Sequence, residues 1–408
     1  MIRSDFAGPA LKHLSDGNWK EEREMAGKDE FQITTQIIYG KESAKRIGEV
    51  ANRLGLKKVQ VVTDAGLVKS GVAEKILQFL KSSGIQTVLF DKVEYNPTVQ
   101  TTDAAKEQFI AEKCDGIVAV GGGSPMDAGK AVGVLATNPG LAAEYLGIGK
   151  VKNPGVPVVC LPTTSGTSAE ITDGAVLSEP EKKTKMGLRS PYVAPTVAIL
   201  DPLLTLTLPP APTRESGLDA LAHAIESYIN LNAWTPTEVL TLKGIELIGR
   251  HLRTATHRGS DYEARDGMMM GSLLAGMGLH TTWVNLVHAI TGPLGGFYNL
   301  PHGAANAIVL PHAMRFLLPK AVSKFADIAR ALGGKVDHLS ERQAAEKAVE
   351  EVEQLSRDVG MPGGLSVYGV KEADLPKLSE TIAGSFLLPL APRIATARDI
   401  LEICKESL

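Results

Sequence analysis

The pattern of strands and helices changes near residue 205, and this change constrains the fold of the 408-residue chain more than any other feature. Between residues 58 and 202, short β-branched runs such as KVQVVTD (58–64) alternate with stretches of helical pattern. Strands that alternate with helices form βαβ units on a parallel sheet. After LPPAPT (208–213), long runs of helical period dominate up to the C-terminus. We therefore predict an α/β domain with a parallel sheet, followed by an all-α domain.

The length of the chain also favours two domains, because 408 residues exceed what one small core organises. We predict an N-terminal arm over residues 1–30, an α/β domain over 31–205 and an all-helical domain over 206–408. The arm has no clear structural pattern, and we expect it to serve contacts in an oligomer.

The composition excludes several classes of protein. Hydrophobic residues make up 44% of the chain and charged residues 22%, which is typical of a soluble globular protein. The net charge of −3 gives no basic surface, so we expect no nucleic-acid partner. No apolar run approaches the roughly 20 residues of a membrane helix, and the N-terminus resembles neither a secretory signal nor a transit peptide. Three scattered cysteines imply no disulfide framework. We therefore expect a cytoplasmic protein that binds no membrane.

A glycine-rich turn joins an apolar strand to a helix in GIVAVGGGSPMDAGKAVG (116–133). Ser124 suits the N-cap, with Pro125 at the first helical position and Asp127 as a short form of the capping box. Glycines let the backbone approach a ligand, and the free N–H groups at a helix start bind anions. A tight turn without a ligand is the alternative, but three consecutive glycines exceed what such a turn requires. The segment therefore favours a phosphate site, although it matches neither the P-loop nor the GxGxxG spacing.

An acidic residue, Asp64, ends the strand KVQVVTD. At the end of a strand in a nucleotide-binding fold, a carboxylate binds ribose hydroxyls and repels a 2′-phosphate, which favours NAD over NADP. Asp64 equally suits the N-cap of the following helix, and both roles can hold at once.

A carboxylate and three imidazoles suggest a metal site in the helical half. Asp219 and His223 lie four residues apart and share one helix face. Capping, a local ion pair and metal ligation all give this pattern. His288 and His302 follow in NLVHAITGPLGGFYNLPHGAANA (285–307). One histidine on an apolar face is more often a core residue, but the complete set suits Fe(II) or Zn(II) and leaves room for a substrate oxygen.

Five segments together resemble the iron-containing (group III) alcohol dehydrogenases, which are related in fold to glycerol dehydrogenases and dehydroquinate synthases. These segments are GGGSPMDAGK, LPTTSGTSAEIT, GLDALAHAIESY, GPLGGFYNLPHGAANAI and PRIATARDI. The resemblance covers residues 31–408. It implies reversible hydride transfer between a small alcohol or aldehyde and NAD, with NADP as the second option. It also implies bound Fe²⁺ or Zn²⁺ and a homo-oligomer, a dimer or larger.

The resemblance also implies roles for individual residues. The ligands of the catalytic metal would be Asp219, His223, His288 and His302. The dinucleotide would be bound in the α/β domain by Asp64, Asn96, Pro97, Gly122, Gly123, Ser124, Asp127, Thr163, Thr164, Thr167 and Lys185. Without the resemblance, Lys185 would be read as part of a solvated charge run, KKTKM.

The sequence departs from the family in the substrate region. Many members carry a second histidine four residues after the third ligand, where this chain has Gly292. A glycine-rich stretch usually precedes that ligand, whereas here the sequence is TTWVNLVH. We therefore expect Trp283, Asn285 and His280 to shape the substrate pocket, although Trp283 taken alone is more often a core residue. The alcohol proton would leave through water, a ribose hydroxyl or His280.

Three other functions compete with a dehydrogenase. A metal-dependent lyase of the dehydroquinate synthase type needs several basic residues, and residues 283–307 contain neither Lys nor Arg. A catalytically silent nucleotide-binding protein and a metal-free reductase of the maleylacetate type would not need the complete set of ligands. We therefore favour a metal-dependent alcohol dehydrogenase.

Overall fold

A six-stranded parallel sheet forms the N-terminal half of the protein. The computed structural model describes residues 30–408, so the predicted N-terminal arm lies outside the described residues except for Glu30. The strands are β1 (Gln36–Tyr39), β2 (Lys58–Val62), β3 (Gln86–Phe90), β4 (Gly116–Gly121), β6 (Val158–Pro162) and β9 (Val197–Leu200), in the spatial order β1-β9-β6-β4-β2-β3. All neighbouring strands are parallel, which confirms the predicted sheet. The first strand was not predicted from the sequence.

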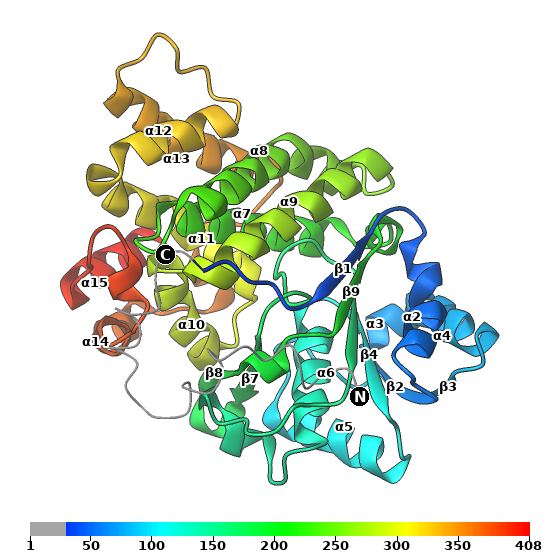
Figure 1. Ribbon diagram of the computed structural model, residues 1–408. Helices are drawn as coiled ribbons and strands as arrows, with labels where there is room; N and C mark the ends of the chain where they lie inside the picture. The colour runs from blue at the N-terminus through cyan, green and yellow to red at the C-terminus, as the bar shows by residue number, and fades with distance from the viewer. Residues whose placement is uncertain (1–29) are drawn as a thin grey trace.

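Helices cover both faces of this sheet (Figure 1). They are α2 (Ile47–Arg53), α3 (Ala65–Lys69), α4 (Val72–Ser82), α5 (Val99–Ala111) and α6 (Gly123–Leu135). Residues of α2 and α4 pack on one face of the sheet, and residues of α5 and α6 pack on the other. The central strands between these layers are buried on both sides, and every residue of β4 and β6 is buried. This explains why they are continuous apolar runs rather than alternating ones.

The order of the strands reverses between β2 and β4. From β2 the chain moves outward to the edge strand β3, and it then returns to β4 on the other side of β2. In open α/β sheets, ligands bind at such a switch point, beside the carboxyl ends of the strands. Asp64 lies just after β2, and the three glycines end β4 and begin α6. Both predicted nucleotide-binding elements therefore lie at the switch point.

A small three-stranded sheet stands beside the large one. It consists of β5 (Gly147–Ile148), β7 (Gly174–Glu179) and β8 (Thr184–Arg189), in the order β5-β8-β7. Strands β7 and β8 form an antiparallel hairpin that the sequence did not predict. The charged segment KKTKM spans the turn of this hairpin and the start of β8, so Lys185 is a strand residue.

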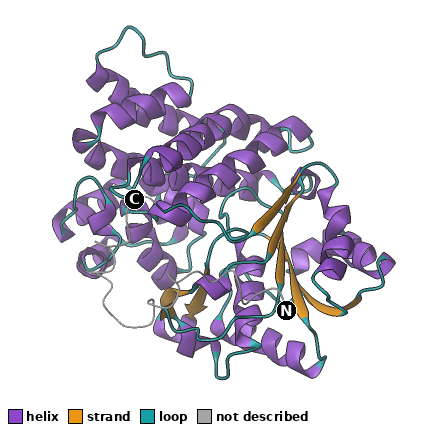
Figure 2. Ribbon diagram, viewed as in Figure 1, coloured by secondary structure: helices purple, strands orange, loops and turns teal. Residues whose placement is uncertain are grey.

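The C-terminal half is helical, as predicted, and the described chain contains no further strand after Leu200 (Figure 2). Its helices are α7 (Pro210–Ile229), α8 (Thr235–His257), α9 (Tyr262–Thr282), α10 (Leu286–Tyr298), α11 (His302–Leu317), α12 (Val322–Ala331), α13 (Glu341–Asp358), α14 (Leu375–Ala383) and α15 (Ala397–Glu406). Helix α7 lies at the centre, where it packs against α8, α9 and α11. Every residue from Gly217 to Ile229 is buried.

The two halves share an apolar contact between the sheet and α9. Met269 and Leu273 of α9 pack against Ala198 and Leu200 of β9. Nearby, the Tyr39 hydroxyl donates to Asp266 Oδ1 at 2.7 Å. The predicted division at residue 205 falls between the end of the sheet and the start of α7. Each helix within residues 30–408 is too short or too polar to span a bilayer.

Candidate metal centre and cofactor site

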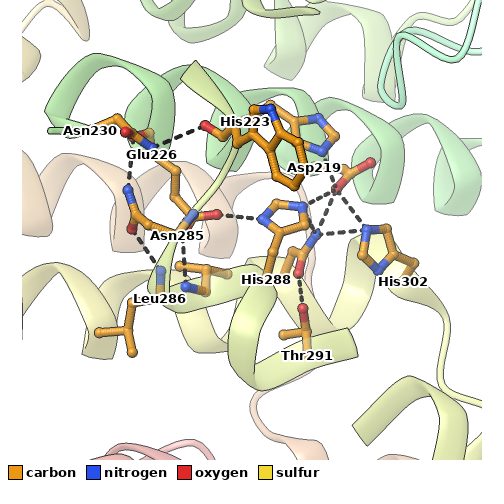
Figure 3. Close-up of polar contacts among 12 residues, drawn as sticks. Asp219, His223, Glu226, Asn230, Asn285, Leu286, His288, Thr291 and His302 are labelled. Atoms are coloured by element: carbon orange, nitrogen blue, oxygen red, sulfur yellow. Dashed lines mark hydrogen bonds and ion pairs between the residues drawn. The ribbon is translucent and has the colours of Figure 1, made fainter. Parts of the chain in front are cut away.

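The four residues predicted as metal ligands meet at one point. Asp219 and His223 come from α7, His288 from α10, and His302 is the first residue of α11. One ligand atom of each residue lies within 4.8 Å of the ligand atoms of the other three. The Asp219 Oδ1 atom is 3.8 Å from His223 Nε2, 3.9 Å from His288 Nε2 and 3.7 Å from His302 Nε2. Figure 3 shows the three rings and the carboxylate directed toward one another.

The side chain of Asn306 shows that the lone pairs of this cluster converge. Its Nδ2 atom lies 2.7 Å from Asp219 Oδ1, 2.9 Å from His288 Nε2 and 3.2 Å from His302 Nε2. This single amide nitrogen faces three acceptor atoms. A cation at the same place would be bound by the lone pairs of these three atoms. Three nitrogen donors and one carboxylate oxygen suit Fe(II) or Zn(II). The residues present therefore fit a divalent metal.

Two of the histidines are held by hydrogen bonds to their other ring nitrogen. His223 Nδ1 lies 3.1 Å from the carbonyl oxygen of Gly166, which can only accept, so Nδ1 carries the proton. His288 Nδ1 bonds to the carboxylate of Glu226, a buried residue of α7 (Figure 3). In both rings Nε2 is left to face the cluster. Such outer partners fix the ring orientation of metal-binding histidines and make them better ligands.

Burial and the neighbouring charges together set the pKa values of the cluster. It lowers the pKa of His223, and it lowers the pKa of His302 to about 3, so both rings are neutral near pH 7. Burial also acts on His288, but the neighbouring Glu226 carboxylate outweighs it and raises the pKa. For Asp219, burial would raise the pKa, but the three imidazoles and the Asn306 amide outweigh it and lower the pKa. An ionised carboxylate with neutral imidazoles is the form that binds a metal.

The cluster is most open on one side. The side chains of Asp219, His223 and His288 are 2%, 7% and 9% exposed, whereas that of His302 is 29% exposed. A ligand from solvent would therefore reach the cluster past His302, which comes at the start of α11.

The N-cap that we predicted for the helix after the glycine turn is wrong. Helix α6 begins at Gly123 with Gly122 as N-cap, so Ser124 lies inside the first turn and Pro125 is not the first helical residue. The Ser124 hydroxyl instead accepts from the backbone N–H of Asn96 at 3.3 Å, a contact from a separate loop. Asp127 does not complete a capping box either, because its carboxylate accepts from Val176 N at 3.0 Å and pairs with Lys130.

The glycines allow a second loop to approach the start of α6. Gly121 has a φ of +155°, which side chains rarely adopt. A Cβ atom on Gly123 would lie 2.8 Å from Thr167 Cγ2, and one on Gly122 would lie 3.2 Å from Thr164 Cγ2. Thr163 donates its backbone N–H to the Gly121 carbonyl at 2.9 Å. The structure thus brings together the two segments that we predicted to hold the dinucleotide.

Asp64 acts as the N-cap of α3. Its Oδ1 atom accepts from the backbone N–H of Leu67 at 3.0 Å. This confirms one of the two roles suggested by the sequence. The contact with ribose hydroxyls stays a prediction, and it is compatible with the cap because a carboxylate has a second oxygen.

Lys185 is not part of a solvated charge run. Its Nζ atom donates to Asn96 Oδ1 at 2.9 Å, and burial lowers the pKa of its ammonium group. The alternative reading of KKTKM is therefore wrong for this residue, whereas a contact with the cofactor stays a prediction. Pro97, the neighbour of Asn96, accepts a backbone hydrogen bond from Ser178 of β7 at 2.8 Å.

The three residues expected to shape the substrate pocket have different surroundings. Asn285 is completely buried and caps α10, because its Oδ1 accepts from Leu286 N at 2.7 Å and its Nδ2 donates to the Glu226 carbonyl at 2.9 Å. This burial argues against direct contact with a substrate. The Trp283 ring stacks on the Arg189 guanidinium at 3.7 Å. His280 Nδ1 lies 3.9 Å from Asp173 Oδ1.

Sequence reasoning missed three residues that organise the site. Glu226 lies seven residues after Asp219, and Asn306 lies four after His302, so helical spacing placed both on the faces of the ligands. Lys130 left no comparable signal. Its ammonium group is fully buried and donates to the Ala169 carbonyl at 2.8 Å, to the Gly174 carbonyl and to Asp127. It thereby ties α6 to the segment between β6 and β7.

The fold and the cluster together define a class of protein, in which a nucleotide-binding α/β half is followed by a helical half that carries a cluster of candidate metal ligands. Comparison with known sequences agrees. A family profile described as "Iron-containing alcohol dehydrogenase" matches residues 34–202, and its C-terminal counterpart matches residues 213–408.

Individual relatives match nearly the whole chain. A 1,3-propanediol dehydrogenase from Klebsiella pneumoniae is 43% identical over 353 residues, which is 86% of this chain and 91% of that protein. An NAD-dependent methanol dehydrogenase from Bacillus methanolicus is 35% identical over 93% of this chain and 99% of its own length. A crystal structure of 1,3-propanediol oxidoreductase superimposes with a TM-score of 0.90 at 40% identity, covering 93% of this chain and 99% of that one. The chain belongs to the iron-containing alcohol dehydrogenase family.

Proposed function

We propose that this enzyme interconverts a small primary alcohol or diol and its aldehyde, with NAD as the hydride carrier and a divalent metal held by Asp219, His223, His288 and His302. One observation carries the proposal: the ligand atoms of these four residues converge within 4.8 Å. The names of the relatives, a propanediol and a methanol dehydrogenase, support a short alcohol as substrate.

The bound groups would supply the reactive chemistry. A divalent metal polarises an alcohol or carbonyl oxygen as a Lewis acid, and the nicotinamide accepts or gives the hydride. The chain contributes position and electrostatics. Asp219 adds a negative charge beside the neutral imidazoles of His223 and His302, and the Glu226 carboxylate holds the N–H of His288 Nδ1, which leaves the lone pair of His288 Nε2 for the metal.

The sheet half would hold the dinucleotide at the switch point. The backbone N–H groups at the start of α6, over Gly122 to Ser124, would bind the pyrophosphate. Thr163, Thr164 and Thr167 stand beside them, and Asp64 at the end of β2 favours a ribose without a 2′-phosphate. Asp127 is held by Val176 and Lys130, and Lys185 would stand beside the nicotinamide ribose. We therefore propose NAD rather than NADP.

The remaining expectations are part of the same proposal. Iron and zinc both suit this ligand set, and we propose iron from the family name. The three cysteines are free and buried in the described part of the chain, which fits the reducing cytoplasm that we expected. A homo-oligomer remains our expectation, and sedimentation of the purified protein would test it.

A panel of alcohols and aldehydes tests the function most directly. The enzyme would be prepared with Fe²⁺ or Zn²⁺ and assayed with NADH and NADPH on C1 to C6 alcohols, diols and aldehydes. We expect net oxidation of NADH with short aldehydes and a clear preference over NADPH. A lyase that reduces NAD only transiently would give no net turnover of the cofactor, and a silent binding protein would give none with any substrate.

A further inference from the structure

Two loops from opposite halves of the protein meet beside the candidate cofactor site. The first contains Tyr95 and Asn96 and lies between β3 and α5. The second begins at Asn299, after α10, and ends at His302, the candidate metal ligand that begins α11. Asn96 and Asn299 both have left-handed backbones, with φ values of +58° and +54°. Asparagine tolerates this conformation better than most residues.

Two hydrogen bonds join these loops. Asn96 Nδ2 donates to Asn299 Oδ1 at 2.8 Å, and the backbone N–H of His302 donates to the Tyr95 hydroxyl at 2.9 Å. Each bond connects a residue of the sheet half with a residue of the helical half. The second one directly holds the backbone of a candidate metal ligand.

Asn96 extends the linkage into the cofactor site. Its Oδ1 atom accepts from Lys185 Nζ at 2.9 Å, and its backbone N–H donates to the Ser124 hydroxyl at 3.3 Å. Lys185 and Ser124 come from β8 and α6, respectively. One asparagine therefore connects the glycine turn, the lysine and the loop that precedes His302.

Hydrogen-bonding capacity fixes the orientation of both amides. The Lys185 ammonium has only donors, so the Asn96 atom that faces it must be Oδ1. The Nδ2 group of Asn96 must then face Asn299, and the Asn299 atom that receives it must be Oδ1. If Asn299 offered no acceptor, the Asn96 amide would lose one of the two partners that orient it, and Lys185 alone would hold its oxygen.

We propose that Asn299 is a positioning residue. It orients the Asn96 amide toward Lys185 and thereby fixes the position of the cofactor site relative to His302. The inference rests on the proposed function, because the linkage between the two loops matters for hydride transfer only if the enzyme carries out this reaction. Small misplacements of reacting groups cost rate steeply, by as much as about a hundredfold for 1 Å. Loss of the Asn299 acceptor should therefore affect the hydride step as well as cofactor binding.

Two substitutions separate the side chain from the backbone. Asn299→Gly keeps a left-handed backbone and removes the acceptor, whereas Asn299→Asp keeps an oxygen that accepts from Asn96 Nδ2. Lys113→Gly is a matched control, because Lys113 has a φ of +54° in an exposed turn. The control measures the effect of a glycine at a left-handed position that takes no part in the linkage between the two loops.

Binding of NADH, followed by its fluorescence in metal-depleted protein, is the first readout. We expect Asn299→Gly to raise the Kd by about threefold to tenfold, the worth of one hydrogen bond. Asn299→Asp and Lys113→Gly should stay within about twofold of the wild type. Wild-type affinity in Asn299→Gly would overturn the inference, and it would do so even if no alcohol were oxidised.

The second readout is the primary deuterium isotope effect on kcat for a deuterated alcohol, with Fe²⁺ bound. Asn299→Gly should lower kcat and raise the isotope effect, because hydride transfer becomes slower than product release. Asn299→Asp should restore both. An unchanged isotope effect with unchanged kcat would contradict the positioning role, whereas a wild-type chain that oxidises no alcohol would overturn the proposed function instead.

Discussion

The two halves of the protein build their sites in different ways. In the sheet half, the candidate cofactor site consists mainly of glycines, backbone N–H groups and short side chains that directly follow strands. In the helical half, the candidate metal site consists of long polar side chains from three helices, separated by up to 83 residues between Asp219 and His302. The glycine turn of the first site is a local property of the chain, whereas the second site exists only after the helices pack.

This difference has a consequence for mutagenesis. If the halves carry separate ligands, changes in the helical half should alter metal binding and leave NADH affinity intact, and changes in the sheet half should do the reverse. Side-chain hydrogen bonds join the two sites at two places, namely the loops at Asn96 and Asn299 and the contact of His223 Nδ1 with the Gly166 carbonyl.

The largest effect is expected from His302→Ala. This change removes one of four candidate ligands, and it should lower alcohol-dependent NADH formation by about a thousandfold or more, because a Lewis acid contributes several kcal/mol. NADH affinity, measured by fluorescence, should stay within about threefold. A variant that keeps its turnover would break the assignment of the metal to the helical half.

Lys130→Met tests the sheet half. The fully buried ammonium holds the Ala169 and Gly174 carbonyls and Asp127, and its loss leaves these groups without their partner. We expect the free energy of unfolding to fall by about 3 kcal/mol, as for other broken buried ion pairs. Denaturation in urea measures this, with the exposed Lys45→Met as control.

The same variant also tests whether the cofactor site and the metal site are separate. Lys130→Met should weaken NADH binding, because Ala169 and Gly174, which follow the candidate cofactor residues Thr163 to Thr167, lose their anchor to α6. The metal content should stay at the wild-type value. Loss of metal with unchanged NADH affinity would show that the two sites are not divided as we describe.

Glu226→Gln should weaken the metal site more gently. The Glu226 carboxylate bonds to His288 Nδ1 and accepts from Asn285 N and Val287 N. Loss of such an outer partner typically lowers metal affinity by about 10-fold to 100-fold. Competition with a chelator measures the change, and Glu246→Gln on the surface of α8 is the control. Equal affinities in both variants would rule out this role for Glu226.

The smallest effect is expected from Gly292→His. Gly292 lies one helical turn after His288 on α10, and a Cβ atom there would meet nothing within 4 Å. The imidazole should fill space one turn from His288 and lower kcat/KM for branched aldehydes by about threefold to tenfold relative to propanal. Gly295→Ala, which also meets nothing within 4 Å, should change neither value. Equal loss for all aldehydes would contradict a role in substrate size.

Local patterns explain most of what could be predicted from the sequence. The parallel sheet, the helical second half and the glycine turn follow from the periodicity of apolar residues and from glycine spacing. The pair Asp219 and His223 followed from helical spacing alone. The residue types also suggested that His288 and His302 complete a metal site, and the resemblance assigned the four ligands, but no local rule brings α7, α10 and α11 to one point.

The errors arose where tertiary contacts override local preference. Ser124 looked like an N-cap, but its hydroxyl bonds to the backbone of Asn96 from a distant loop. Lys185 looked solvated, because the hairpin of β7 and β8, from which its ammonium group reaches Asn96, was not recognised. Strand β1 was missed because it has only four residues, of which Ile38 alone is buried, and because it pairs with β9, more than 150 residues later. The N-terminal arm, the oligomer and the cytoplasmic location remain predictions.

Titration of metal-free enzyme with Fe²⁺ tests the central claim most directly. The chain would be stripped with a chelator, and its NADH-forming activity with 1,3-propanediol would be followed as Fe²⁺ is added back. We predict no turnover without metal and a linear recovery that ends at one metal ion per chain. Full activity in metal-free protein, or recovery by His302→Ala with the same stoichiometry, would contradict a catalytic cation held by these four residues.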